Sequence, residues 1–367
     1  MRCLPRCVAA LALAFVLGIA PAAAQQQALP APPPAPVDVP ADTADRQRNA
    51  LTLGTLSFPN SGSEAAQQAF KTGLLALHSF WYPEARDRFQ QAQRLDPGFA
   101  MAYWGEAMTH EHGLWEQHDG DAGRAVLAAL DSAKAAGAVE TTEREQAYLS
   151  AVRTLYEGDG DISERRAAYA EEMTRLAERF SGDEEATLFA ALARMAAPRF
   201  ALDDASEVVN VAAPLEALYK DRTRHPGVLH YLIHAYDSKT FAPMGLRMAR
   251  TYAEVAPASS HALHMPSHIF RRLERWEDMA ASNADAYQAS VQWQKRSGRP
   301  LRMRDFHAYR WLFDAYMAQD QYDKTQQLIS RLEGLVEKAE RRGEDPGYMP
   351  ELADRLRKHQ ERRTMTE

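Results

Sequence analysis

The 367-residue sequence holds only two cysteines, Cys3 and Cys7. Both lie in the first 24 residues, which also carry Arg2 and Arg6, an apolar run, and three alanines directly before Gln25. This order is typical of a secretory signal with a small-residue cleavage site, so residues 1–24 are predicted to be removed. A chain that starts at Gln25 has no thiol, which excludes disulfides, lipid attachment through cysteine and thiolate metal sites. We therefore expect a periplasmic or secreted protein.

Long apolar runs and a surplus of positive charge are also missing. The apolar run of the signal is about a dozen residues, and no later run approaches the roughly 20 apolar residues that a spanning helix needs. We therefore expect no membrane insertion. The formal net charge is −7, and removal of Arg2 and Arg6 lowers it to about −9. This balance argues against nucleic acid as a partner.

Familiar catalytic motifs are absent as well. The sequence has no GxSxG, no phosphate loop, no GxGxxG after a strand and no HExxH. The string His110-Glu111-His112 is too short for the zinc-protease helix, in which the two histidines are four residues apart. The sequence therefore assigns no catalytic residue.

Helical periodicity dominates what is present. Residues 25–60 open with six prolines between Pro30 and Pro40 among alanine and glutamine, which predicts a disordered spacer. From Ser63 onward, apolar residues recur at spacings of three and four, with no alternation of the kind that predicts strands. We predict an all-α domain over residues 61–340, followed by a charged capping helix or tail over residues 341–367.

An internal repeat refines this prediction. The stretch from residue 66 to residue 99 carries small, aromatic and proline residues at regular places, namely Gly73, Tyr82, Ala85, Phe89, Ala92 and Pro97. The pattern resembles the tetratricopeptide repeat (TPR) family, and its frame recurs at Ala100, Trp276 and Tyr322. The resemblance implies an α-solenoid of about five to seven antiparallel hairpins, whose concave groove holds a peptide or protein partner.

Two histidine pairs stand in register with this repeat. His230 and His234 are four residues apart, as are His264 and His268, so each pair can share one face of a helix. The second pair follows the first by 34 residues at both members, which is one repeat length. We therefore expect the four imidazoles to form a single cluster on the groove wall.

Neutral imidazoles at this spacing suit a transition metal such as zinc or copper. His225 and His307 are further candidate ligands. A helix that began at Pro266 would leave His264 before its first turn and would favour a set of His225, His230, His234 and His268. Two alternatives remain open: the cluster contacts an acidic peptide or anion, or it binds no ligand.

Other polar and aromatic side chains are predicted to face the groove of the array. Asn283 holds the place that Phe89 has in the first unit, so its amide either orients a groove histidine or faces a loop. The predicted groove contacts are Trp104, Glu111, His112, His307, Arg310 and Asp314.

Two functions are compatible with these residues. The first is a periplasmic scaffold that binds a peptide or protein partner in its groove. The second is a metal-binding protein or metal-dependent enzyme with its site at the four clustered histidines. The histidine segments also resemble those of uncharacterised exported bacterial TPR proteins, a likeness that supplies no catalytic residue.

Overall fold

The structure, a computed structural model, describes residues 51–137, 139–198 and 200–364. The predicted signal segment and the predicted spacer up to residue 50 lie outside the described residues. Almost all of the described secondary structure is α-helix, which confirms the predicted all-α class. None of the helices in these ranges combines the length and the apolar character that crossing a bilayer would need.

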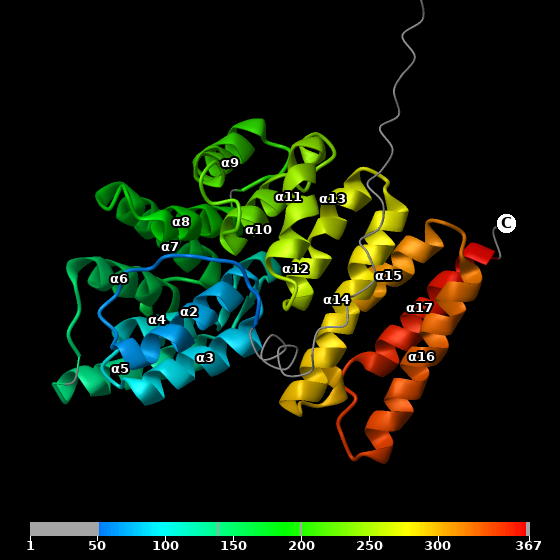
Figure 1. Ribbon diagram of the computed structural model, residues 1–367, viewed down its shortest axis with the longest axis horizontal. Helices are drawn as coiled ribbons and strands as arrows, with labels where there is room; N and C mark the ends of the chain where they lie inside the picture. Colours follow the sequence, from blue (N-terminus) through cyan, green and yellow to red (C-terminus); the bar gives the residue numbers. More distant parts are fainter. Residues whose placement is uncertain (1–50, 138, 199, 365–367) are drawn as a thin grey trace, which may run out of the picture. The chain divides into compact units, whose positions relative to one another are not determined.

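The first half of the described chain is a series of helices joined by short turns (Figure 1). These are α2 (Glu64–His78), α3 (Tyr82–Leu95), α4 (Ala100–Met108), α5 (Gly120–Ala135), α6 (Glu143–Glu157), α7 (Ile162–Arg179), α8 (Glu184–Ala196) and α9 (Ala205–Tyr219).

A small β-hairpin interrupts this series between α4 and α5. Its strands are β1 (Glu111–His112) and β2 (Gln117–His118), joined by the 3-10 turn η1 (Gly113–Trp115). The strands are antiparallel, with Glu111 opposite His118. The helix that begins at Ala100 therefore ends too early to carry Glu111 and His112, which lie in the hairpin instead.

The second half of the described chain continues with helices. They are α10 (Pro226–Ala235), α11 (Ala242–Val255), α12 (Ser260–His264), α13 (Pro266–Arg272), α14 (Trp276–Ser297), the 3-10 turn η2 (Leu301–Met303), α15 (Phe306–Met317), α16 (Tyr322–Arg341) and α17 (Met349–Thr364).

Helices α12 and α13 follow one path across Pro266. Met265, which joins them, has φ −55° and ψ −35°, which are helical values. His264 therefore stays one turn before His268, as it would in an unbroken helix. A helix does begin at Pro266, as the alternative ligand set assumed, but His264 stays on the same helical path as the last residue of α12.

Helices that are neighbours in the chain pack against each other, both within hairpin pairs and between them, as α3 with α4, α7 with α8 and α14 with α15 do. The pairs are α2 with α3, α4 with α5, α6 with α7, α8 with α9, α10 with α11, α12 and α13 with α14, and α15 with α16. Helix α17 packs on α15 and α16, at the place where the sequence predicts a charged capping helix. The superhelical arrangement of a TPR array stays a prediction.

Small residues allow close helix packing in the first pairs. The ring of Phe89 on α3 is fully buried between Gly73 on α2 and Gly105 on α4. A Cβ atom at Gly105 would lie 2.4 Å from that ring, and one at Gly73 would lie 3.0 Å from it. Any larger side chain at these two places would push the helices apart.

Residues 51–60 correct the predicted spacer. Leu53, Leu56 and Phe58 are buried in the helical core, and the Thr55 amide donates to the carbonyl of Arg224 at 3.0 Å. Alternating apolar side chains in this stretch explain why it packs instead of remaining a spacer. The last ten residues of the predicted spacer therefore belong to the packed part of the chain.

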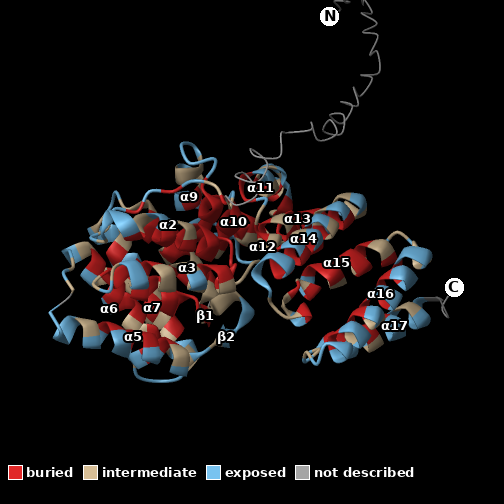
Figure 2. Cartoon of the chain, turned by 60° about the horizontal axis from the view of Figure 1, so that its bottom comes forward, coloured by how far each residue is buried: buried red, intermediate tan, exposed pale blue. Residues whose placement is uncertain are grey.

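Helix α10 lies in the middle of the described helices. It packs on α9 and α11, and it also contacts α2, α8 and α13, which are distant in sequence. Buried residues concentrate where these helices meet, as Figure 2 shows in red. Histidines on α10 are therefore held by packing from several sides.

Candidate metal centre

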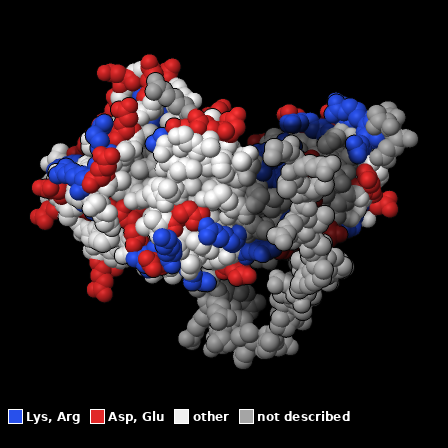
Figure 3. All heavy atoms as spheres, turned by 90° about the horizontal axis from the view of Figure 1, so that it is seen from above, with Lys and Arg blue, Asp and Glu red and all other residues white. Residues whose placement is uncertain are grey.

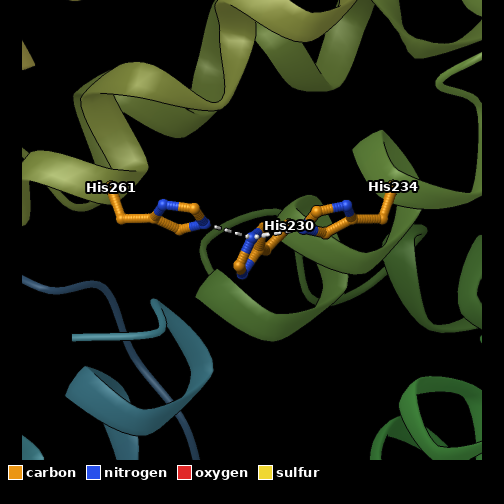
Figure 4. Close-up of side chains that lie close together, drawn as sticks. All are labelled: His230, His234 and His261. Carbon is orange, nitrogen blue, oxygen red and sulfur yellow. Dashed lines mark hydrogen bonds between the residues drawn. The ribbon is translucent and has the colours of Figure 1, made fainter. Parts of the chain in front are cut away.

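The first histidine cluster consists of His230, His234 and His261. Two of its members come from α10, and His261 is the second residue of α12. The Nε2 atom of His230 lies 3.0 Å from that of His234 and 3.1 Å from that of His261. Figure 4 shows the other two rings directing their edges at His230 from opposite sides.

The second histidine cluster consists of His264, His268 and His307. His264 ends α12, His268 lies on α13, and His307 is the second residue of α15. The Nε2 atom of His264 lies 3.1 Å from that of His268 and 3.1 Å from that of His307. Each cluster therefore brings three Nε2 atoms to one place.

Both clusters follow one construction rule. Counted from the first residue of each unit, His230 and His234 are residues 5 and 9 of α10, and His261 is residue 2 of the next unit. His264 and His268 take the same places 5 and 9, counted from Ser260 as residue 1, and residue 2 of α15 completes the second cluster. Each cluster thus joins two consecutive units.

A helix terminus orients His230. His78 is the last residue of α2, where carbonyl groups lack a partner within the helix. The Nδ1 atom of His230 donates to this carbonyl at 2.6 Å. A neutral ring that donates from Nδ1 carries its lone pair on Nε2, so His230 presents a bare nitrogen to its cluster.

Asn283 orients His264. The side-chain amide of Asn283 donates to the carbonyl of Met279 at 2.7 Å, which leaves its Oδ1 atom to accept from Nδ1 of His264 at 2.6 Å. The predicted role of Asn283 beside a groove histidine agrees with this geometry. The amide accounts for a polar residue at a fully buried place where Phe89 stands in the first unit.

Asp237 orients His268. Its Oδ2 atom accepts from Nδ1 of His268 at 2.7 Å, and its Oδ1 atom accepts from Nε of Arg272 at 2.7 Å. Burial alone would raise the pKa of Asp237, but these hydrogen bonds and charges lower its pKa below the usual range. An ionised carboxylate behind an imidazole is a common support for a metal ligand.

These supports leave an unusual contact in the second cluster. His264 and His268 both donate from Nδ1, so in neutral rings both Nε2 atoms carry lone pairs. The two atoms nevertheless lie 3.1 Å apart. Only a proton on one ring or a shared cation turns this contact into an attractive one.

Burial disfavours a proton on His264 and on the rings of the first cluster. Desolvation, followed by the charges of neighbouring histidines, holds the pKa of His264 well below its usual value. The same causes lower the pKa of His230 and of His261, and burial lowers the pKa of His234 to about 3. At neutral pH these rings are uncharged, the form in which imidazole binds metals.

The spacing of the nitrogen atoms suits a metal ion after small movements. Zinc–nitrogen bonds of about 2.0–2.1 Å in a tetrahedral site place ligand nitrogens about 3.3 Å apart. Two of the three nitrogen pairs in each cluster have distances of 3.0 to 3.1 Å, slightly shorter than this, and all ligand atoms of a cluster lie within 4.8 Å of one another. Binding of an ion would therefore require the rings of each cluster to shift until all three nitrogens face it.

The two clusters adjoin each other. The ring centroids of His234 and His268 are 6.0 Å apart, and those of His261 and His264 are 5.8 Å apart. Trp311 stacks on His268 at 4.5 Å and closes one side of the second cluster. Six histidines thus form one continuous patch of imidazoles.

A strained turn holds an aromatic ring against the first cluster. Phe80, between α2 and α3, has φ +49°, in the left-handed region that disfavours bulky residues. The equivalent turn positions before Trp276 and Tyr322 are polar, Glu274 and Asp320. The Phe80 ring packs 4.3 Å from the ring of His230.

The predicted ligand set is partly corrected. The four histidines predicted to form one cluster fall into two clusters, because residues 5 and 9 of one unit face residue 2 of the next. His307 joins the second cluster, as one of the further candidates. His225 joins neither: its Nε2 atom lies 2.9 Å from Oε1 of Glu185. His261 was missed, although it shares with His307 the second place of a unit.

Besides His307, the predicted groove contacts are either engaged inside the protein or partly exposed. Trp104 is fully buried against Phe58, Tyr148 and Phe189, so the expectation of a groove contact fails there. Glu111 is also engaged internally, with Nε of Arg166 at 2.7 Å and Nδ1 of His118 at 2.5 Å.

The remaining groove candidates keep some exposure. His112 stacks on Tyr82, with ring centroids 3.7 Å apart, at the wall of a cavity. Arg310 and Asp314 form a partly exposed ion pair at 3.7 Å. They occupy residues 5 and 9 of α15, the places that hold histidines in the two preceding units.

The cavity at His112 has a volume of about 610 Å³ and reaches both clusters, since His261 and His307 form part of its wall. Its size is that of ordinary small-molecule sites. The other rings of the wall are Phe80, Trp81, Tyr82, Trp115 and Trp293.

Comparison with known proteins adds no relative to this description. No family model matches the chain, and no curated protein matches its sequence significantly.

Proposed function

We propose that the protein binds two transition-metal ions, zinc or copper, one in each histidine cluster. The observation that carries this proposal is the pair of Nε2 atoms of His264 and His268, both bare of hydrogen in neutral rings and 3.1 Å apart. A cation between them removes the repulsion of their lone pairs.

The supports behind the rings strengthen the proposal. Metal-binding histidines usually donate their second nitrogen to a carboxylate or a carbonyl, which fixes the tautomer. His230 has a backbone carbonyl, His264 an amide oxygen and His268 a carboxylate in this role. The two clusters therefore carry orienting contacts of the kind that established sites have.

Each cluster supplies three nitrogen ligands. Sites with three protein ligands leave a fourth position for water or another molecule, as in catalytic zinc sites. Imidazole ligands suit copper equally, and copper binds such sites more tightly than zinc does. The cavity beside His261 and His307 would give a small molecule access to such positions.

The rival function, a scaffold for a peptide in a groove, has less support. Two of its six predicted contacts, Trp104 and Glu111, are buried in internal packing or ion pairs. Figure 3 shows acidic and basic side chains interspersed around a broad uncharged area on the face that it draws.

Metal content tests the proposal directly. The chain, purified without an affinity tag and incubated with zinc or copper, should retain about two ions after dialysis. His230→Gln and His264→Gln should each retain about one ion, and the double variant none. Elemental analysis gives the stoichiometry, and circular dichroism verifies that each variant keeps its helices.

His359→Gln is the matched control, because His359 is an exposed histidine on α17 outside both clusters. It should retain the same metal as the unmodified chain. A folded protein that binds neither zinc nor copper would refute the proposal and return the scaffold to first place.

A further inference from the structure

The cavity of about 610 Å³ beside the clusters has a distinctive wall. Its aromatic rings come from the α2–α3 turn, the start of α3, the β1–β2 hairpin and α14. Tyr82 and His112 lie parallel, and Trp115 stands edge-on to both, at centroid distances of 5.4 and 5.6 Å. Rings in these orientations offer faces and edges to a flat ligand.

Trp115 sits at the edge of this wall and is partly open to solvent. It is 42% exposed, one of few large apolar side chains so exposed in the described residues. Its ring also contacts that of His261, at 5.4 Å. Trp115 therefore presents exposed apolar surface beside the cavity, which a ligand could cover.

Two arginines add positive charge to the same wall. Arg304 is only 9% exposed, and its guanidinium donates two hydrogen bonds to the neutral amide oxygen of Gln294, at 3.1 and 3.0 Å. Arg86 donates to the hydroxyl and the carbonyl of Thr109, each at 3.1 Å. Within the described ranges, no carboxylate forms an ion pair with either arginine.

The one carboxylate of the wall is already engaged. Asp305 accepts from the Ser260 hydroxyl at 2.6 Å and from the backbone amide of Ala308 at 2.8 Å. A buried guanidinium without a counter-charge is costly, so an anionic ligand group would be favoured beside Arg304. Guanidinium groups match planar carboxylates particularly well.

We infer that this cavity binds a planar aromatic carboxylate, with its ring among Tyr82, His112 and Trp115 and its carboxylate at Arg304. The inference rests on the proposed metal function, since it names the class of ligand that the same site would serve. His261 and His307 line the cavity and also belong to the two clusters. A ligand held there would lie beside both proposed ions.

Calorimetric binding of defined probes tests the inference. We expect 2-naphthoate to bind the full chain, whether metal-free or loaded with zinc, and 2-naphthamide to bind about 10- to 100-fold more weakly, because the amide lacks the charge-assisted contact. Cyclohexanecarboxylate, which has the charge but no flat ring, should also bind at least about tenfold more weakly.

Variants separate the two parts of the cavity. Arg304→Gln should weaken 2-naphthoate about 10- to 100-fold and leave 2-naphthamide unchanged. Trp115→Ala should weaken both probes by a similar factor. Arg94→Gln is the control, because Arg94 is an exposed arginine further along α3 that does not line the cavity.

The outcomes distinguish this inference from the metal proposal. Absence of 2-naphthoate binding, or equal affinity for acid and amide, would overturn the inference even in a chain that holds two ions. Binding of 2-naphthoate that depends on Arg304, in a chain that never takes up metal, would uphold the inference and refute the metal proposal.

Discussion

Two kinds of histidine group in this protein differ in what their ring nitrogens face. In the group formed by His78, Glu185 and His225, every ring nitrogen has a partner in the protein. His78 contacts Oε2 of Glu185 at 2.6 Å and the Tyr231 hydroxyl at 2.9 Å. His225 contacts Oε1 of Glu185 at 2.9 Å and the Gly227 amide at 3.1 Å.

In the two histidine clusters the Nε2 atoms face one another instead of a carboxylate or a hydroxyl. In all three groups the possible ligand atoms lie within 4.8 Å of each other. Proximity therefore does not separate a metal site from a structural network. The count of protons and lone pairs does so at His264 and His268, because their Nε2 atoms both lack hydrogen in neutral rings and face each other.

The largest effect that would test this comparison is on stability. Glu185→Ala should lower the free energy of unfolding by about 3–5 kcal/mol, because it leaves two buried histidines without their partner. Urea unfolding measures this loss. Glu184→Ala, next to it but in a partly exposed pair with Arg222, should cost less than about 1 kcal/mol. Equal losses in the two variants would show that the buried group is not structural.

Metal addition should stabilise the folded protein only by binding at the two histidine clusters. Zinc at about 100 times its dissociation constant should raise the free energy of unfolding by about 2.7 kcal/mol for each independent site. The gain should disappear in the His230→Gln/His264→Gln variant and persist in His225→Gln. A gain that vanished in His225→Gln instead would reverse the assignment of the two kinds of group.

A smaller effect is expected from the residue that supports His264. Asn283→Ala should weaken metal binding at the second cluster about 10- to 100-fold, because the ring loses its orienting acceptor. Competition with a coloured chelator resolves this change, and the first cluster should keep its affinity. Asn210→Ala, an exposed asparagine on α9, provides the control. Unchanged affinity in Asn283→Ala would show that packing alone orients His264.

The sequence was informative about the helices that carry the clusters. Tyr82, Ala100, Trp276 and Tyr322, expected from the repeat frame, each begin a helix. Periodicity suffices there because small and bulky residues recur at fixed places along a helical hairpin. The spacing of 34 residues also placed His230 and His264 at equivalent positions.

Other features could not be obtained from the frame. No role is predicted for His78 from the sequence, yet its backbone carbonyl orients His230 from 152 residues away in the sequence. Spacing carries no information about such contacts between distant elements. The hairpin at residues 111–118 was not predicted either. The helical repeat frame does not show that α4 ends at Met108.

The grouping of the histidines shows most clearly what sequence spacing cannot predict. A pair four residues apart indicates a shared helix face, but not which residue of the next unit meets it. His261 precedes His264 by only three residues, yet the two rings belong to different clusters. Closeness in sequence does not predict this division. A count from the first residue of each unit would have found His261 and His307 together.

The turn at Phe80 has a consequence for the entropy of binding. A non-glycine residue in the left-handed region costs about 1–3 kcal/mol, which the surrounding fold must offset. Folding offsets that cost, and the folded turn holds the Phe80 ring against His230 before any ligand binds. The His230 side chain is therefore already ordered before an ion binds. Ion binding at the first cluster then costs less conformational entropy than binding to a mobile imidazole would.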